Sequence, residues 1–171
     1  MDSLVLRPMA PQDLHAVLDL QCRGYPPPLH DSEAAFLSRM ALAPGLNLTA
    51  WSKSGLAGYL VSHPWAAGDP PPVDALLAAG TPAECWYVHD LSVAEAARGL
   101  GLARTLLSAG RDAARALGLA RSELIAVEGA APFWIRQGWR PPQAVSQALA
   151  AKVAGYGPAA VFMTREELGD L

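Results

Sequence analysis

The stretch R-G-L-G-L-A-R, residues 98–104, has the composition of a phosphate-binding loop and lies between two apolar segments. A strand, a glycine turn and a helix in this order commonly bind phosphate, because the first helical turn has unpaired N–H groups and a positive dipole end. Gly99 and Gly101 would let a phosphate approach those N–H groups, and Arg98 could add a charge-assisted contact. A plain connector that needs positive φ values is the alternative, and the glycine pair alone does not decide.

Two other nucleotide-binding motifs are excluded at this loop. The pattern G-x-x-x-x-G-K-[ST] of nucleoside triphosphatases is absent. The dinucleotide pattern G-x-G-x-x-G fails because Arg104 stands at the third glycine position. The acidic residue expected about 20 positions further on, at the end of a second parallel strand, is also absent.

The elements around the loop follow from hydrophobic periodicity. Residues 85–93, C-W-Y-V-H-D-L-S-V, predict a strand, and residues 102–117 predict an amphipathic helix that ends at Gly118. A second strand is predicted over residues 122–127, followed by a short helix over residues 130–137. The loop should therefore connect a strand to the amphipathic helix.

The rest of the chain predicts a mixed sheet with helices on its faces, an α/β (α+β) fold. We expect a strand at residues 4–6, a helix after Pro11, a helix capped by Ser32 and an antiparallel hairpin over residues 47–63. Residues 64–84 predict a long proline-rich loop with room for one helical turn at 73–79, and residues 159–164 predict the last strand. One domain should cover residues 1–171.

Composition narrows the partners. Of 171 residues, 51% are hydrophobic and the net charge is −3 without a run of like charges, so we expect no nucleic-acid partner. No signal peptide and no apolar run of about 18 residues is visible, so we expect a cytoplasmic protein without a membrane partner. Cys22 and Cys85 are far apart and give no metal-ligand spacing, so we expect two buried free thiols and no metal.

The loop and its neighbours together resemble the GCN5-related N-acetyltransferase (GNAT) superfamily. R-G-L-G-L-A matches the pattern Arg/Gln-x-x-Gly-x-Gly/Ala, L-S-V precedes it, and A-x-x-F-W-x-x-x-G-W follows it. The resemblance is clearest over residues 91–139, and the order of elements extends it more weakly over the chain. It implies a GNAT-type central mixed, mostly antiparallel sheet of six to seven strands, splayed between strands 4 and 5 and flanked by about four helices.

The resemblance implies acetyl-CoA as the cofactor, bound in the gap between the two splayed strands. Backbone groups of one strand would pair with the pantetheine arm, the glycine loop would hold the pyrophosphate, and two aromatic side chains would lie at the pantetheine and thiol end. Core packing is the alternative for the aromatic pair. The implied cofactor-binding residues are Leu91, Ser92, Val93, Arg98, Gly99, Leu100, Gly101, Leu102, Ala103, Arg104, Phe133 and Trp134.

The implied activity is direct transfer of an acetyl group to a primary amine of a small molecule or peptide through a ternary complex. H-D-L-S-V resembles the H-x-L-x-V of arylalkylamine acetyltransferases, so His89 is the first candidate for the general base, and Glu128 is the second. Histidine side chains titrate at about pH 6.5, which suits a general base. A strand histidine held by a backbone partner is the alternative for His89. The Val93 N–H is the implied oxyanion donor.

The leaving-group acid departs from the family pattern. The family commonly uses a tyrosine in the short helix, but Trp134 stands there, and an indole is a poor proton donor to a thiolate. Tyr156, in A-G-Y-G-P, could replace it, and water could also serve. A catalytically weak or inactive GNAT-fold sensor that binds acyl-CoA is therefore the alternative function.

The substrate side should come from the first two helices and the last hairpin. Tyr25 and Pro26 lie on the loop between those helices and are predicted to form a pocket wall; a rigid connector is the alternative. Tyr87 should point to the same strand face as His89, and Asp90 to the opposite face, because side chains alternate along a strand. The resemblance leaves a homodimer open.

Overall fold

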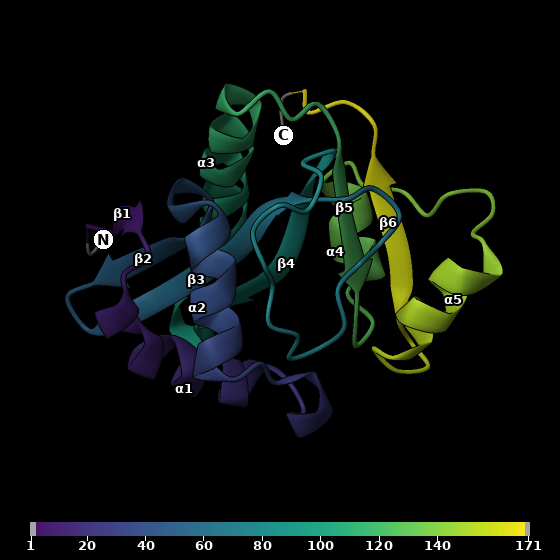
Figure 1. Ribbon diagram of the computed structural model, residues 1–171. Coiled ribbons are helices and arrows are strands. Elements are labelled where there is room, and N and C mark those ends of the chain that lie inside the picture. Colours follow the sequence, from purple (N-terminus) through teal and green to yellow (C-terminus); the bar gives the residue numbers. More distant parts are fainter. Residues whose placement is uncertain (1–2, 170–171) are drawn as a thin grey trace.

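Six strands form one sheet in which each strand lies beside the next one in the chain. The computed structural model describes residues 3–169. The strands are β1 (Val5–Pro8), β2 (Leu48–Ser52), β3 (Gly55–Trp65), β4 (Cys85–Val93), β5 (Ser122–Ala126) and β6 (Val161–Arg165) (Figure 1). Only β4 and β5 run parallel among these neighbours. The predicted mixed, mostly antiparallel sheet is confirmed.

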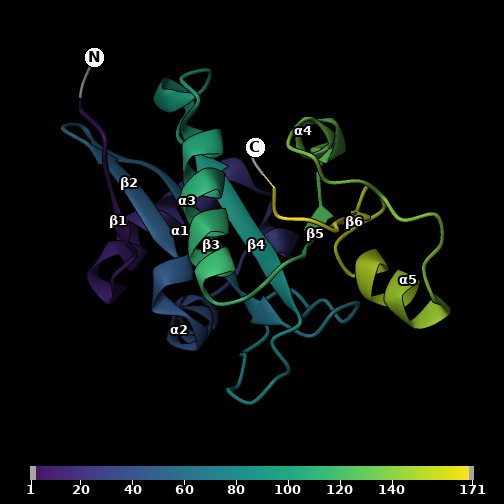
Figure 2. The ribbon, with the colours of Figure 1, turned by 90° about the horizontal axis from the view of Figure 1, so that it is seen from above.

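Helices cover both faces of this sheet, as Figure 2 shows. The α-helices are α1 (Leu14–Gly24), α2 (Glu33–Leu42), α3 (Leu102–Ala116), α4 (Ala131–Arg136) and α5 (Gln147–Ala154). Tyr59 and Val61 of β3 pack with α1 and α2, whereas Leu60 between them packs with α3. This alternation along β3 separates two hydrophobic clusters, one on each face.

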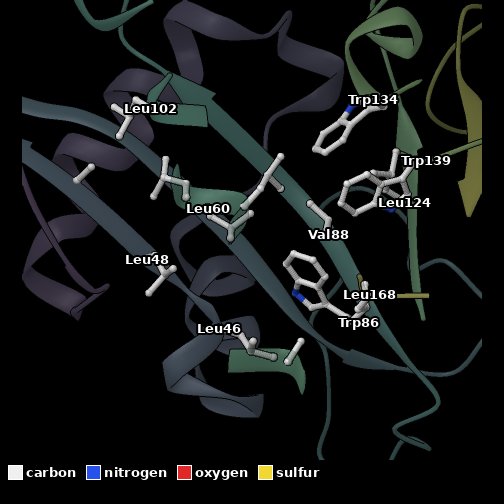
Figure 3. Close-up of a cluster of buried hydrophobic side chains, with 14 of the residues drawn as sticks. Leu46, Leu48, Leu60, Trp86, Val88, Leu102, Leu124, Trp134, Trp139 and Leu168 are labelled. Carbon is white, nitrogen blue, oxygen red and sulfur yellow. The ribbon is translucent and has the colours of Figure 1, made fainter. Parts of the chain in front are cut away.

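A glycine brings α3 close to the sheet. A Cβ on Gly110 would lie 2.5 Å from Leu60 Cδ2 and 2.9 Å from Trp86 Cζ2. Both neighbours are fully buried, and Figure 3 shows them in the core around Val88. The close approach fixes α3, and with it the glycine turn before the helix, against β3 and β4.

The parallel pair β4 and β5 is joined at one end only. The residue pairs are Trp86 with Ser122 and Tyr87 with Glu123, after which the strands diverge (Figure 1). At the joined end, Ser122 Oγ donates to the Trp86 carbonyl at 2.8 Å and accepts from Trp139 Nε1 at 3.2 Å. The predicted splay between strands 4 and 5 is therefore present.

The structure differs from the predictions in several elements. The sequence analysis missed α5, which is capped by Ser146, whose side chain accepts from the Leu149 N–H. No helical turn forms at residues 73–79, where Asp74 instead has a left-handed φ of 59°. Cys85 is buried as expected, but Cys22 is exposed because it faces outward from the last turn of α1.

Two kinds of feature are absent from residues 3–169. No helix there is long and apolar enough to cross a membrane. The same residues contain no group of three or more histidine, cysteine, aspartate or glutamate side chains placed to hold a metal ion.

Candidate active site

A β-bulge in β4 puts His89 and Asp90 on the same face of the sheet. Val61 of β3 pairs with Asp90, and the next residue, Ser62, pairs with Val88, so His89 is the extra residue. Asp90 Oδ2 accepts a hydrogen bond from the Tyr59 hydroxyl at 2.6 Å, on the face covered by α1 and α2. The prediction that Asp90 faces the opposite way is wrong, because strict alternation requires a regular strand.

A cavity of about 560 Å³ occupies the space where β4 and β5 diverge. Its walls come from β4, β5, the turn into α4, the loop between α1 and α2, the proline-rich loop and the segment after α5. The structure thus brings together most of the predicted site residues. Those that line the cavity are Tyr25, His89, Leu91, Ser92, Val93, Arg98, Ala103, Glu128, Phe133, Trp134 and Tyr156.

The other predicted residues lie near the cavity without lining it. Tyr87 is 1% exposed and lies behind His89, with ring centroids 6.0 Å apart. Pro26 is exposed at the start of the turn that follows Tyr25. Leu102 is buried in the core, whereas Gly99, Leu100 and Gly101 of the turn and Arg104 in the first turn of α3 are exposed.

His89 is held by a carboxylate from the loop between α1 and α2. Its Nε2 lies 2.7 Å from Asp31 Oδ2, and both side chains are about 95% buried, with 4% and 5% exposed. Since an ionised carboxylate only accepts, we assign the proton of the neutral ring to Nε2. Nδ1 then carries a lone pair, and this atom has no hydrogen-bond partner within the described residues. The lone pair of the neutral ring therefore lies on Nδ1, which is buried.

Asp31 is ionised in this setting. Burial alone would raise the pKa of its carboxyl, but the hydrogen bond from His89, the charge of Arg39 and the Asp74 N–H lower that pKa, and a proton gained by His89 would lower it further. The Asp31 carboxylate is thus a fixed negative charge in the wall of the cavity.

Two tyrosines in the cavity wall remain protonated at neutral pH. Burial raises the pKa of Tyr156 to about 12, and its hydroxyl donates to the Pro71 carbonyl. Burial and the nearby charge of Asp90 raise the pKa of Tyr25 well above its usual value, and its hydroxyl donates to the Leu91 carbonyl at 2.9 Å. Tyr156 can therefore donate a proton but is unsuited to act as a base.

The glycine turn exposes the first turn of α3. Gly99 and Gly101 have φ values of 77° and 78°, and Gly101 is the N-cap residue, so no side chain caps the helix there. A Cβ at either position would meet no atom within 4 Å. The backbone thus requires glycine, and the space in front of the turn is open to an anionic group. These positive φ values fit a plain connector as well as a phosphate-binding loop.

Glu128 has a strained backbone at the turn between β5 and α4. It has a φ of 49°, is exposed and lines the cavity. Phe133 is half-buried in the same wall, whereas Trp134 is 8% exposed and packs on Trp139 with ring centroids 5.4 Å apart. Core packing, the alternative role for the aromatic pair, thus accounts for much of the burial of Trp134.

Sequence reasoning missed Asp31, Arg39 and Asp74. Asp31 stands 58 residues before His89, and the only local signal is an acidic residue next to the capping Ser32. Arg39 is fully buried in α2, although its charge suggests a surface position. Their role is visible only once α1, α2 and β4 are packed together.

Comparisons with known proteins agree with this geometry. The sequence model of the acetyltransferase (GNAT) family matches residues 14–139. No curated protein matches the sequence.

Three solved structures are similar over nearly the whole chain. GphF, a GNAT-like decarboxylase in complex with isobutyryl-CoA, has a TM-score of 0.75 at 19% identity, covering 96% of this chain and 100% of that one. A chain of the NatC complex bound to Gag peptide and CoA has a TM-score of 0.71 at 16% identity, with coverages of 97% and 99%. Ard1 from Thermoplasma volcanium has a TM-score of 0.70 at 15% identity, with coverages of 97% and 99%. Similarity at these identities establishes the fold.

His63 of β3 lies beneath the site, and its burial predicts that the stability of the fold depends on pH. It is fully buried, with its ring centroid 6.1 Å from that of His89, and burial lowers its pKa to about 3. The unfolded chain binds a proton at His63 below pH 6.5, whereas the folded protein does not until about pH 3, so stability falls as the pH decreases through this range. We expect His63 to account for a loss of about 2 kcal/mol in unfolding free energy between pH 7 and 5.

Urea unfolding at both pH values checks this prediction. His63→Gln should lose about 2 kcal/mol less than the wild type between pH 7 and 5, and the control His15→Gln, at an exposed position of α1, should behave as the wild type. An unchanged pH dependence in His63→Gln would refute it.

Proposed function

Because the chain belongs to the acetyltransferase (GNAT) family, we propose that it transfers an acetyl group directly from acetyl-CoA to the primary amine of a small molecule or peptide. The observation that carries this proposal is the contact between His89 and Asp31 in the wall of the cavity between β4 and β5. It supplies a base where the amine must lose its proton, since alkylamines are mostly protonated at pH 7.

The cavity fits acetyl-CoA, which supplies an activated thioester. Beyond Tyr87, β4 has no paired residue in β5 within the described chain, so its edge is open to an extended pantetheine arm at Leu91, Ser92 and Val93. The uncapped first turn of α3 and the Arg98 guanidinium suit the pyrophosphate. Phe133 would cover the pantetheine arm from the opposite wall.

The proposed proton transfers use groups already placed in the cavity wall. His89 accepts the amine proton at Nδ1 while Nε2–H stays hydrogen-bonded to Asp31. Because Nδ1 is buried, a water molecule or a small rotation of the ring would complete this path. The Val93 N–H would donate to the carbonyl oxygen that gains negative charge. Glu128 is the second base candidate.

Tyr156 is the proposed donor to the leaving thiolate. Its raised pKa keeps the hydroxyl protonated, but that proton is donated to the Pro71 carbonyl, so the role requires the hydroxyl to turn. Pro26 and Tyr25 would border the acceptor entrance, and Tyr87 would support His89 from behind rather than touch the acceptor.

An acyl-CoA sensor without transfer activity is the second candidate function. One observation favours it: Trp134 replaces the helix tyrosine and is packed against Trp139 in the core. A sensor would still need the open edge of β4 and the exposed turn before α3.

A thiol-release assay separates the two functions. With acetyl-CoA and a panel of primary amines, we expect the wild type to release free CoA with at least one amine. His89→Gln should lower kcat by about 100-fold with unchanged CoA affinity, because general-base catalysis typically contributes that much. The control His15→Gln should match the wild type. Tight CoA binding without thiol release on any amine would favour the sensor.

A second prediction concerns the cofactor site. Arg98→Glu should raise the Kd for CoA about 10-fold in calorimetry and leave the Kd for pantetheine unchanged, because only CoA carries the pyrophosphate. The matched control Arg115→Glu makes the same charge change at the other end of α3 and should leave both Kd values unchanged. An equal loss for CoA and pantetheine in Arg98→Glu would contradict the pyrophosphate contact.

A further inference from the structure

We propose that Asp31 is a positioning residue that holds His89 in the orientation and tautomer that leave Nδ1 free to accept the amine proton. This inference rests on the proposed function, since it requires His89 to be the base. It adds to that function a residue from outside the strand that carries the base.

The backbone of Asp31 is pinned before its side chain makes any contact. The Asp31 N–H donates to Gln21 Oε1 at 2.8 Å, and Gln21 Nε2 donates to the Asp31 carbonyl at 3.0 Å. Gln21 is 2% exposed in α1, so this pair of bonds ties the end of the proline-rich turn at residues 26–28 back to the helix. Because the buried Gln21 amide makes both hydrogen bonds to the Asp31 backbone, it fixes the position from which the Asp31 side chain extends.

The two carboxylate oxygens of Asp31 have different partners. Oδ1 accepts from the Asp74 N–H at 2.6 Å and from Arg39 Nη2 at 3.3 Å. Oδ2 accepts from His89 Nε2 at 2.7 Å. With Oδ1 occupied from α2 and from the proline-rich loop, the plane of the carboxylate is set and Oδ2 is directed at the imidazole.

Arg39 explains why the proton would stay on His89. Its side chain is fully buried, with 0% exposed, and its Nε and Nη1 atoms have no hydrogen-bond partner within the described residues. Burying a guanidinium with a single carboxylate partner is costly, so the charge has little value as a stabilising ion pair. It does favour the ionised form of Asp31, which keeps the carboxylate from taking the proton that His89 receives.

Asp31 is not needed as the cap of the helix that follows it. Asp31 precedes α2, but Ser32 already caps that helix, because its Oγ accepts from the Ala35 N–H at 3.3 Å. The carboxylate is instead directed across the fold to β4. The bulge in β4 also contributes to this contact, because it moves His89 out of the regular strand pairing.

Several charged or titratable groups face His89 and must be considered in its pH dependence. His63 remains neutral down to about pH 3, and burial raises the pKa values of the remaining neighbours on β4 and after α5. Asp31, His63, Tyr87 and Asp90 interact with His89 directly, while Arg39 contacts Asp31 and Tyr156 lines the same cavity.

Asp31→Asn tests the inference in the thiol-release assay. We expect kcat to fall about 10- to 100-fold with an unchanged KM for acetyl-CoA. The acid limb of the kcat/KM profile should move to lower pH by about one unit, because the carboxylate no longer favours the imidazolium form. The double variant Asp31→Asn/His89→Gln should be no slower than His89→Gln, because the two residues act as one unit. The control Asp19→Asn removes an exposed carboxylate of α1 and should leave the profile unchanged.

The outcomes separate this inference from the proposed function. A slow His89→Gln, together with a wild-type pH profile in Asp31→Asn and an additive loss of rate in the double variant, overturns the inference and keeps the base. A wild-type rate in His89→Gln overturns the inference and the role of His89 as base, while release of CoA with an amine still supports acetyl transfer. Should Asp31→Asn fail to fold by thermal unfolding, Asp31→Glu retains the charge but displaces the carboxylate: a lowered kcat with an unshifted acid limb supports the inference, and a wild-type kcat overturns it.

Discussion

The parallel pairing of β4 with β5 ends after Tyr87 and Glu123, and the rest of the site depends on this interruption. One end of the pair is locked by Ser122 Oγ, which bonds the Trp86 carbonyl and the Trp139 indole. The strands therefore open in one direction only. The opening leaves a cavity of about 560 Å³ and an unpaired edge of β4, and α3 begins beside it because Gly110 holds that helix against Trp86.

Buried charge is concentrated beneath this opening. Asp31, Arg39 and Asp90 are each at least nine-tenths buried, and Asp90 is kept on the His89 face by the bulge. Such an arrangement is expensive for stability, because each charge loses its hydration and regains only a few hydrogen bonds. Perturbed groups of this kind gather at functional sites, and here they surround the single imidazole that lines the cavity. The fold itself does not choose the reaction, since a similar structure belongs to a GNAT-like decarboxylase.

Local sequence signals predicted most of the fold. The antiparallel hairpin of β2 and β3, the amphipathic stripe of α3 and the Ser32 cap each depend on a few neighbouring residues, and all three appear in the structure. Helix α5 could have been found from its Ser146 cap and the Gly155 that follows it. The glycine turn was predicted as a cofactor loop only through its neighbours, because its positive φ values suit a connector equally well.

What escaped prediction depends on long-range register. The bulge exists because Val61 and Ser62 of β3 pair with Asp90 and Val88, and no local pattern in β4 records this. Asp31 meets His89 only because Gln21 and Arg39 hold the α1–α2 loop over β4. A sequence can therefore nominate the histidine, while the carboxylate that orients it becomes visible only in the folded chain.

The tautomer of His89 in the free protein tests the role of Asp31 most directly, and it can be read from ¹⁵N NMR of the histidine rings at about pH 8 and assigned with His89→Gln. The role of Asp31 as acceptor from Nε2 predicts a protonated Nε2 and an unprotonated Nδ1. A ring protonated at Nδ1 would contradict it, since the atom assigned to receive the amine proton would already carry one.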